Sequence, residues 1–209
     1  MKILFVNPSS SFLINDKVFP TLGLLYLSAN VKKFGYNDVR LIDLNGNNSL
    51  PDYIEADIVG IYANTPQFLA ATRIINQLKK INRIKDALYI IGGPHVSGTP
   101  YDAIESFDVI VQGEGENALL NIIKDKEAGR TIKEKIIRCE YEKDIDKFPF
   151  PDRDLIDIKE YKYSINSKAT TTLITSRGCP YACNFCANNV WGKTLRLRSP
   201  GNILEELRV

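Results

Sequence analysis

The first 126 residues alternate between two hydrophobic patterns, and this alternation limits the possible folds more than any other feature of the chain. Short, almost continuous apolar runs are typical of buried strands, and the longer segments between them place apolar residues at the spacing of one helix face. The strand-like runs are residues 2–7, 38–44, 57–63, 88–93 and 108–113, and the helix-like segments are residues 22–35, 67–81 and 115–126. Repeated strand–helix units imply parallel strands joined by right-handed crossovers. The sequence therefore predicts an α/β fold, a doubly wound five-stranded parallel sheet of Rossmann-like type, with Gly35 ending the first helix.

Unusual residues gather where the predicted strands end, in "NPSSS", "ANTP", "GGPHVSG" and "QGEGE". Tight turns use Gly, Pro and Ser in any case. However, ligands of such sheets bind beyond the carboxyl ends of the strands, and four such loops would meet at that edge. The sequence therefore predicts a binding surface there. Its candidate residues are Asn7, Thr65, Gly92, Gly93, His95, Gly113, Glu114, Gly115 and Glu116.

The remaining third of the chain is less regular. Residues 127–168 are expected to form a linker region, in which "TIKEKIIRCEYE" is either a strand or a hairpin arm and residues 146–157 are rich in Pro and Asp. The β-branched run at residues 169–176 predicts a new strand that opens a second unit, residues 169–209. The roles of Arg196 and Arg198 stay open between contact with a carboxylate and solvated strand charges.

The composition limits location and partners. The net charge of +2 gives no electrostatic reason to expect nucleic acid or a membrane surface as partner. No apolar run reaches the length of a membrane span, and the start, "MKILFVNPSS", is too soon broken by Asn7-Pro8 for a signal peptide. We therefore expect a cytoplasmic protein whose thiols stay reduced and whose partners are small molecules.

Three of the four cysteines lie close together, with the spacing C-x-x-x-C-x-x-C at Cys179, Cys183 and Cys186. Three thiolates can hold three irons of a four-iron cluster and leave the fourth iron open for a ligand. A structural zinc site would need a fourth ligand, for which Cys139 remains possible and His95 lies far away in sequence. The spacing favours an iron–sulfur cluster over zinc, and a reduced compartment disfavours disulfides.

A strand that runs into this cysteine spacing, with aromatic Phe185 before the last cysteine, resembles the radical S-adenosylmethionine (SAM) enzymes. The resemblance implies that Cys179, Cys183 and Cys186 ligate a 4Fe-4S cluster whose open iron binds SAM. It also implies that reductive cleavage of SAM yields a 5′-deoxyadenosyl radical, that Phe185 lies near the adenine, and that a reductase or flavodoxin supplies the electron in the full enzyme.

The N-terminal part has a resemblance of its own. "FPTLGLLYLSANVKKFGY", "GGPHVSG" and "VIVQGEGE" together resemble the domain that precedes the barrel in cobalamin (B12)-binding radical SAM proteins. This implies that residues 1–126 bind cobalamin. The chain lacks the stretch D-x-H-x-x-G that supplies a histidine to cobalt, so we expect His95 to be a turn residue bonded to backbone and cobalt to have no protein ligand. Glu114 and Glu116 are explained by a helix start, and a hydrogen bond to a corrin amide or to the nucleotide tail is the alternative.

A barrel of the radical SAM type needs roughly 200 residues, near the size of other α/β barrels. Residues 169–209 have room for one strand and its helix. We therefore expect the N-terminal portion of a larger, cobalamin-dependent radical SAM enzyme, with methyl transfer or cyclisation of an unidentified substrate as its reaction and no catalytic residue in this part. The alternatives are a stand-alone cobalamin-binding module without catalysis and a zinc-stabilised α/β binding protein.

Overall fold

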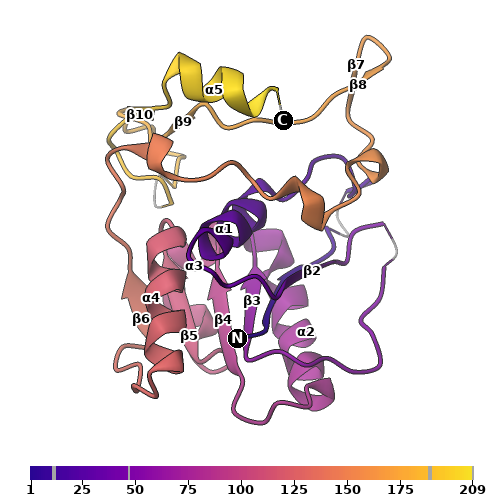
Figure 1. Ribbon diagram of the computed structural model, residues 1–209, viewed down its shortest axis with the longest axis vertical. Coiled ribbons are helices and arrows are strands. Elements are labelled where there is room, and N and C mark those ends of the chain that lie inside the picture. The colour runs from indigo at the N-terminus through magenta and orange to yellow at the C-terminus, as the bar shows by residue number, and fades with distance from the viewer. Residues whose placement is uncertain (11–12, 47, 188–189, 209) are drawn as a thin grey trace.

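The computed structural model describes residues 1–10, 13–46, 48–187 and 190–208, so Ser11 of the first predicted loop lies outside it. Six parallel strands form one sheet in the order β2-β1-β3-β4-β5-β6 (Figure 1). The strands are β1 (Ile3–Asn7), β2 (Val39–Asp43), β3 (Ile58–Tyr62), β4 (Leu88–Gly92), β5 (Val109–Gln112) and β6 (Ile136–Arg138). The predicted parallel sheet of the first 126 residues is confirmed.

A sixth strand extends the predicted sheet. β6 lies within "TIKEKIIRCEYE", for which the sequence left a strand or a hairpin arm open, and its parallel pairing with β5 confirms the strand. Two of its three residues are isoleucines, and they join the sheet because the edge of β5 offers backbone partners. The sheet therefore continues beyond residue 126.

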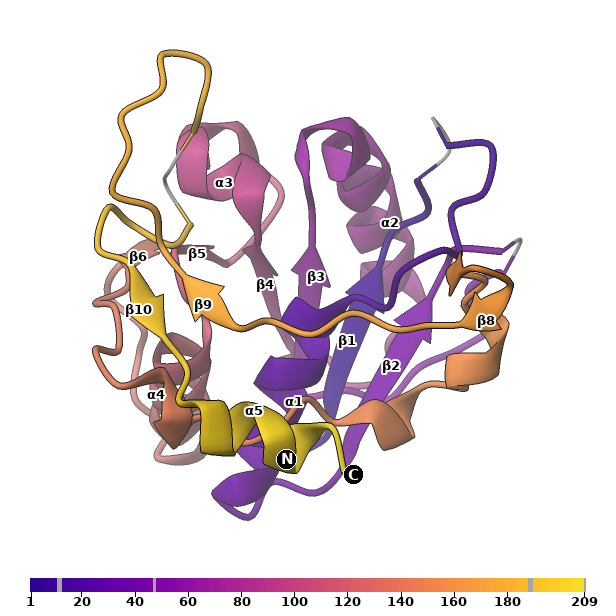
Figure 2. The same ribbon diagram turned by 90° about the horizontal axis from the view of Figure 1, so that it is seen from above.

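Helices cover both faces of the sheet (Figure 2). They are α1 (Leu22–Lys33), α2 (Phe68–Ile81), α3 (Pro94–Gly98) and α4 (Glu116–Glu127), with short 3-10 turns η1 (Thr65–Gln67) and η2 (Pro100–Ala103). Side chains of α1 and α4 pack with one set of alternate strand residues, and those of α2 and α3 pack with the other set. Gly35 follows α1 with a φ of 93°, as its predicted capping role requires.

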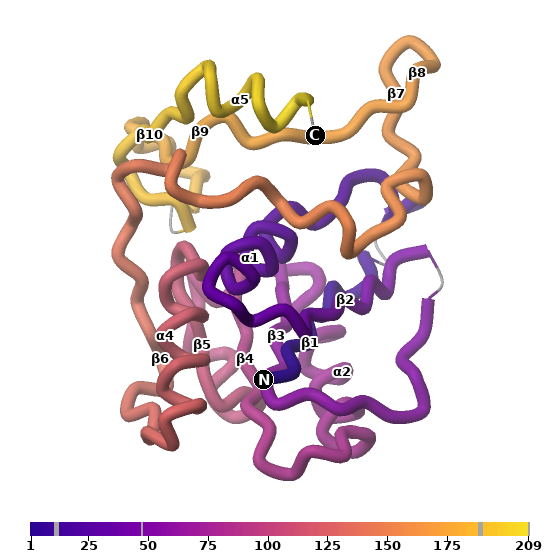
Figure 3. Tube along the Cα trace, in the orientation of Figure 1, coloured from indigo at the N-terminus to yellow at the C-terminus, as the bar shows by residue number. Residues whose placement is uncertain are grey.

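The chain after β6 lies against the α1 side of this domain. Figure 3 shows it crossing above α1 toward β2, turning at a hairpin and returning. This part contains η3 (Ile145–Lys147), η4 (Arg153–Leu155), η5 (Ile158–Glu160), β7 (Ser164–Ile165), β8 (Lys168–Ala169), β9 (Ser176–Arg177), β10 (Arg196–Leu197) and α5 (Pro200–Glu206). Asp152 ties the crossing segment to α1, because its backbone N–H donates to Leu25 O at 3.1 Å and its carboxylate lies 2.6 Å from Lys32 Nζ.

The strand predicted over residues 169–176 is mostly wrong. Only its two ends belong to strands, Ala169 to β8 and Ser176 to β9, and residues 170–175 are not in a sheet. β9 instead forms a two-stranded antiparallel ribbon with β10. A β-branched segment becomes a strand only where a second strand runs beside it. Thr170 N donates to Tyr163 O and Thr175 O accepts from Arg198 N, next to the two ribbons, but no described strand pairs with the residues between them. None of the described helices is long and apolar enough to cross a membrane.

The two faces of α2 allow a direct test of the core. Leu78 is fully buried against the sheet, whereas Leu69 on the same helix is 68% exposed. Leu78→Ala is expected to lower the free energy of unfolding by about 2–5 kcal/mol, since it removes apolar contacts and leaves a cavity. Leu69→Ala is expected to change it by less than about 0.5 kcal/mol. Urea unfolding followed by circular dichroism measures both, and equal losses would contradict the assigned helix face.

Candidate functional site

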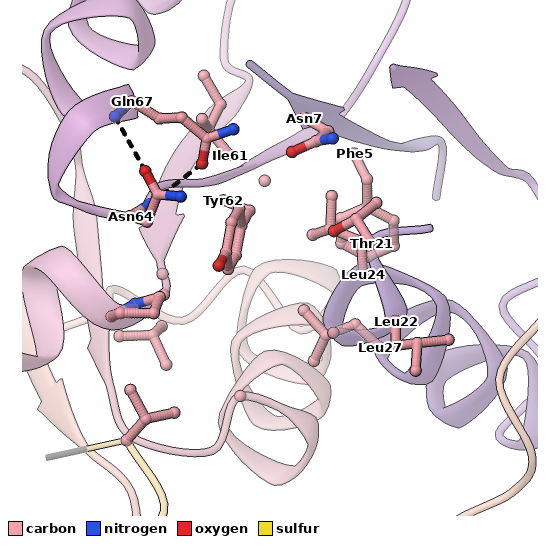
Figure 4. Close-up of a pocket in the computed structure, with 18 of the residues that line it drawn as sticks. Phe5, Asn7, Thr21, Leu22, Leu24, Leu27, Ile61, Tyr62, Asn64 and Gln67 are labelled. Atoms are coloured by element: carbon pink, nitrogen blue, oxygen red, sulfur yellow. Dashed lines mark hydrogen bonds between the residues drawn. The ribbon is translucent and has the colours of Figure 1, made fainter. Parts of the chain in front are cut away.

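A cavity of about 530 Å³ lies between the sheet and α1, at the carboxyl ends of β1, β3, β4 and β5. Figure 4 shows Phe5 and Tyr62 from the sheet and Leu24 and Leu27 from α1 around it. Ile90, Val111 and Leu119 extend the apolar lining toward α4. This position is the edge at which the sequence predicts a binding surface.

The register of the sheet explains why the cavity exists. Phe5, Gly60 and Ile90 are neighbours across β1, β3 and β4, so they occupy one row on the same face. Gly60 carries no side chain, and the ring of Phe5 occupies the space above it, because a Cβ there would lie 3.0 Å from Phe5 Cδ1. One row further toward the carboxyl ends, Gly92 is paired with Tyr62 and leaves open space, since a Cβ there would meet only Val111 O, at 3.9 Å. Gly60 therefore allows Phe5 to lie against β3, and Gly92 leaves the space between the sheet and α1 open.

Gly93 fixes the turn at the mouth of the cavity. Its φ of 109° is unfavourable for other residues, and a Cβ would lie 2.7 Å from the carbonyl oxygen of Ala63. Burial raises the pKa of Tyr62, so its phenol stays protonated and can donate a hydrogen bond near this turn. The mouth of the cavity is therefore formed by the closely packed backbone at Gly93 and by the uncharged phenol of Tyr62.

Two polar residues that the sequence analysis missed hold the loops around the mouth. Asn64 and Gln67 cap each other's backbone, with Gln67 N 3.0 Å from Asn64 Oδ1 and Asn64 N 3.3 Å from Gln67 Oε1 (Figure 4). Gln67 Nε2 also donates to Pro8 O at 2.7 Å and to Ser10 Oγ at 3.0 Å. The loop after β3 is thereby joined to the loop after β1. The sequence signal was the spacing N-x-x-Q at a helix start.

Most predicted binding residues do line the cavity, namely Asn7, Gly92, Gly93, Gly113, Glu114, Gly115 and Glu116. Thr65, His95 and Phe185 are not among the described residues that line it. Phe185 is 93% exposed. Both glutamate carboxylates are buried against Arg177 and Arg196 and are already engaged there.

His95 lies on the α2 side of the sheet. Its ring stacks on Phe68 with 4.0 Å between ring centroids, and its Nε2 lies 3.3 Å from Asp102 Oδ2. Its Nδ1 lies 3.4 Å from Thr65 Oγ1. The expectation that the ring bonds to backbone is therefore wrong, because side chains are its partners. That cobalt receives no protein ligand stays a prediction.

Cys179, Cys183 and Cys186 are exposed in the loop between β9 and β10, of which residues 188–189 lie outside the described part. The described residues contain no group of three or more Cys, His, Asp or Glu side chains placed to hold a metal ion. The donor set suits a cluster, since all three are thiols of one loop, but the loop does not bring them together in this conformation.

Cys139 has a different environment. It is half-buried beside α4, and burial raises the pKa of its thiol to about 12, with further increases from the carboxylates of Glu116 and Glu114. A thiol of this pKa stays protonated near neutral pH and is a weak nucleophile.

Comparison with known proteins identifies the family of this α/β domain. Residues 16–123 match the family model described as B12 binding domain, and the chain belongs to this family. Over its full length it is 31% identical to an uncharacterized methyltransferase of Pyrococcus horikoshii, of which it covers 50%. It is 26% identical, again over its full length, to the anaerobic magnesium-protoporphyrin IX monomethyl ester cyclase of Rubrivivax gelatinosus, of which it covers 42%. The chain thus spans about half the length of these relatives.

Two solved structures share the fold over 99% of the chain. One is the cobalamin-dependent S-adenosylmethionine radical enzyme OxsB with aqua-cobalamin and SAM bound, with a TM-score of 0.79, 21% identity and 31% of that chain covered. The other is the radical SAM methyltransferase TsrM of Kitasatospora setae with cobalamin and a 4Fe-4S cluster bound, with a TM-score of 0.69, 17% identity and 45% covered. The predicted resemblance to radical SAM proteins with a cobalamin-binding domain is confirmed.

The cysteine environments predict different thiol reactivities. In the folded chain, iodoacetamide at neutral pH is expected to label exposed Cys183 and Cys186 at least about tenfold faster than Cys139, because each unit of raised pKa lowers the thiolate fraction about tenfold. Mass spectrometry of time points measures the rates, and a urea-unfolded sample serves as the control in which Cys139 also reacts. Rapid labelling of Cys139 in the folded chain would show that its burial is misjudged.

Proposed function

We propose that this chain binds cobalamin in the cavity between the sheet and α1, and that the whole protein combines it with a 4Fe-4S cluster and SAM in a radical reaction. The observation that carries the first part is the apolar slot at the carboxyl edge, where Gly92 leaves open space, in a chain of the B12 binding domain family. An apolar slot with a few polar groups at its mouth suits a large ligand with an uncharged aromatic end.

The residues present fit cobalamin in their chemistry. The apolar side chains of Phe5, Leu24 and Ile90 would surround the aromatic base of its nucleotide tail. The backbone at Gly92, Gly93 and the loop 113–116 would lie along the corrin ring, whose amide groups need donors and acceptors. When bound, cobalamin would supply the chemistry of methyl-group transfer. The chain's own residues orient it and keep water from the buried tail.

The second part of the proposal concerns Cys179, Cys183 and Cys186, which would ligate three irons and leave one iron for SAM. It is supported by the C-x-x-x-C-x-x-C spacing and by the shared fold with OxsB and TsrM. The relatives' names support methyl transfer or cyclisation as the reaction class. A reductase or flavodoxin as electron donor, Phe185 near the adenine and the start of a second unit at residue 169 are parts of the same proposal.

A cobalamin-binding module without catalysis is the second candidate. The observation that favours it is the exposed, separate placement of the three cysteines in the described structure. The zinc-stabilised alternative needs Cys139 as fourth ligand, and in the described part of the chain this thiol belongs to no group of three or more side chains placed to hold a metal ion. A cytoplasmic location stays a prediction.

A larger side chain at Gly92 tests whether cobalamin binds in this cavity. A Cβ at Gly92 would meet only Val111 O, at 3.9 Å, so Gly92→Leu is expected to fold while its side chain occupies the cavity. Hydroxocobalamin binding, followed by its visible spectrum, is expected to weaken at least about tenfold, a loss of about 1.4 kcal/mol. Gly201→Leu in α5, where a Cβ also has open space, is the matched control and is expected to bind normally. Unchanged binding by Gly92→Leu would place cobalamin elsewhere.

The cysteines are tested by anaerobic reconstitution with iron and sulfide. The unaltered chain is expected to take up about four irons, and Ala at Cys179, Cys183 or Cys186 is expected to reduce this sharply, because each thiolate holds one iron. Cys139→Ala is the matched control and is expected to retain full uptake. Purification with bound zinc that depends on Cys139 would instead support the zinc-stabilised protein.

A further inference from the structure

Four almost fully buried charged side chains join the cysteine segment to the cobalamin-binding domain. Arg177 of β9 and Arg196 of β10 are directly opposite each other in the antiparallel ribbon that forms the base of the cysteine loop. Glu114 and Glu116 lie at the start of α4, after β5. The four side chains are between 3% and 6% exposed.

The ion pairs have close geometry. Arg196 contacts Glu114 with both amino groups, Nη2 to Oε1 at 2.6 Å and Nη1 to Oε2 at 3.0 Å. Arg177 Nη2 donates to Glu116 Oε1 at 2.7 Å, and its Nη1 lies 3.8 Å from Glu114 Oε1. The guanidinium of Arg177 also lies over the ring of Trp191, with its Cζ 4.7 Å from the centroid.

Burial of these four charges carries a desolvation penalty that an apolar contact would not have. Like charges opposite each other on a ribbon repel, and burial removes the water that would screen them. Within the described part of the chain, Arg177 Nη1 and Arg196 Nε are buried without a hydrogen-bond partner. An apolar contact of the same size would stabilise the fold at least as well, so the cluster is better explained by the fixed geometry that it imposes.

The same residues define both ends of the cysteine loop. Gly178, with a φ of 85°, separates Arg177 from Cys179, and a Cβ there would lie 2.0 Å from Thr194 O. Cys179 N donates to Gly192 O at 3.2 Å, and Arg196 Nη2 donates to Trp191 O at 2.8 Å. The first cysteine is therefore held within two residues of the ion pairs.

The other end of this loop is part of the cavity. Val190 and Trp191 line it together with Glu114 and Glu116, although they follow them by more than seventy positions. The ion pairs thus set the place of Cys179 and of one cavity wall at once.

We propose that Glu114, Glu116, Arg177 and Arg196 are positioning residues that couple the two cofactor sites, so that cobalamin binding and cluster assembly strengthen each other. The inference rests on the proposed function. Because a coupling between two bound groups is reciprocal, a loaded cluster must tighten cobalamin binding by the same factor by which cobalamin stabilises the cluster.

The experiment measures the dissociation constant of hydroxocobalamin with and without a reconstituted cluster, under anaerobic conditions, in the unaltered chain and in Arg177→Met and Arg196→Met. The arginines are not among the described residues lining the cavity, so their loss does not remove a cavity contact. The unaltered chain is expected to bind at least about fivefold more tightly when its cluster is loaded. Each variant is expected to lose this difference, and Arg177→Lys is expected to restore part of it because the charge remains.

Glu206→Gln is the matched control for a buried ion pair. Glu206 of α5 is 3% exposed and pairs with Arg198 and with Arg153, at 3.0 Å from the latter, away from the cavity. This variant is expected to lower stability but to keep the fivefold difference. Thermal unfolding by circular dichroism shows that each variant is folded at the temperature used.

The outcomes separate the two proposals. Failure of the unaltered chain to bind hydroxocobalamin overturns the proposed function and with it the coupling. Binding without any effect of the cluster, or a coupling that survives in Arg177→Met and Arg196→Met, overturns the positioning role alone. Loss of coupling in Glu206→Gln as well overturns it too, because general destabilisation would then explain the effect.

Discussion

The backbone pairing of β1, β3 and β4 is the constraint on which the rest of the structure depends. Parallel pairing in this register places Phe5, Gly60 and Ile90 in one row, so the ring of Phe5 can lie over the glycine of β3. A shift by one residue would turn Gly60 to the α2 face and place a branched side chain against Phe5. The register therefore determines both where the core is filled and where it is open.

The helices on this face of the sheet enclose the cavity. α1 packs over the same face, and Asn30 in it donates to Glu116 O at 3.0 Å, which fixes α1 against the start of α4. Ser28 and Lys32 of α1 in turn contact Asp152, so the segment after β6 is held across the helix. α1, which covers the cavity, is thus held by the start of α4 on one side and by the segment after β6 on the other.

The sequence predicted the elements whose signal is local. Five strands and three long helices follow from apolar runs and helical spacing, because both faces of the sheet are covered. For β6 the sequence left a strand and a hairpin arm open, because three residues are too few to show a periodicity. The strand prediction for residues 170–175 was wrong because β propensity does not supply a partner strand. The role of Gly60 was also not predicted, although a glycine inside a buried strand indicates the close approach of another group.

The site depends more on contacts between distant residues. Glu114 was explained by its place near a helix start, and Arg196 was left between a carboxylate contact and solvent. No pattern along the chain reveals that Glu114 and Arg196 form an ion pair. They are 82 positions apart in sequence and meet only in the folded chain, where β10 lies near the start of α4. His95 is a second case, since its partners on α2 and η2 could not be predicted from the sequence either.

The cysteine loop combines a fixed base with an accessible tip. The ladder of β9 and β10 involves only two residues of each strand, and without the buried charges it would be marginal. With them, Trp191 is held at the cavity and the backbone of Cys179 is held at the base of the loop, while Cys183 and Cys186 are exposed. Under the proposed function, the buried base would set the distance between the two cofactors. The exposed tip would leave the thiols accessible to iron and sulfide.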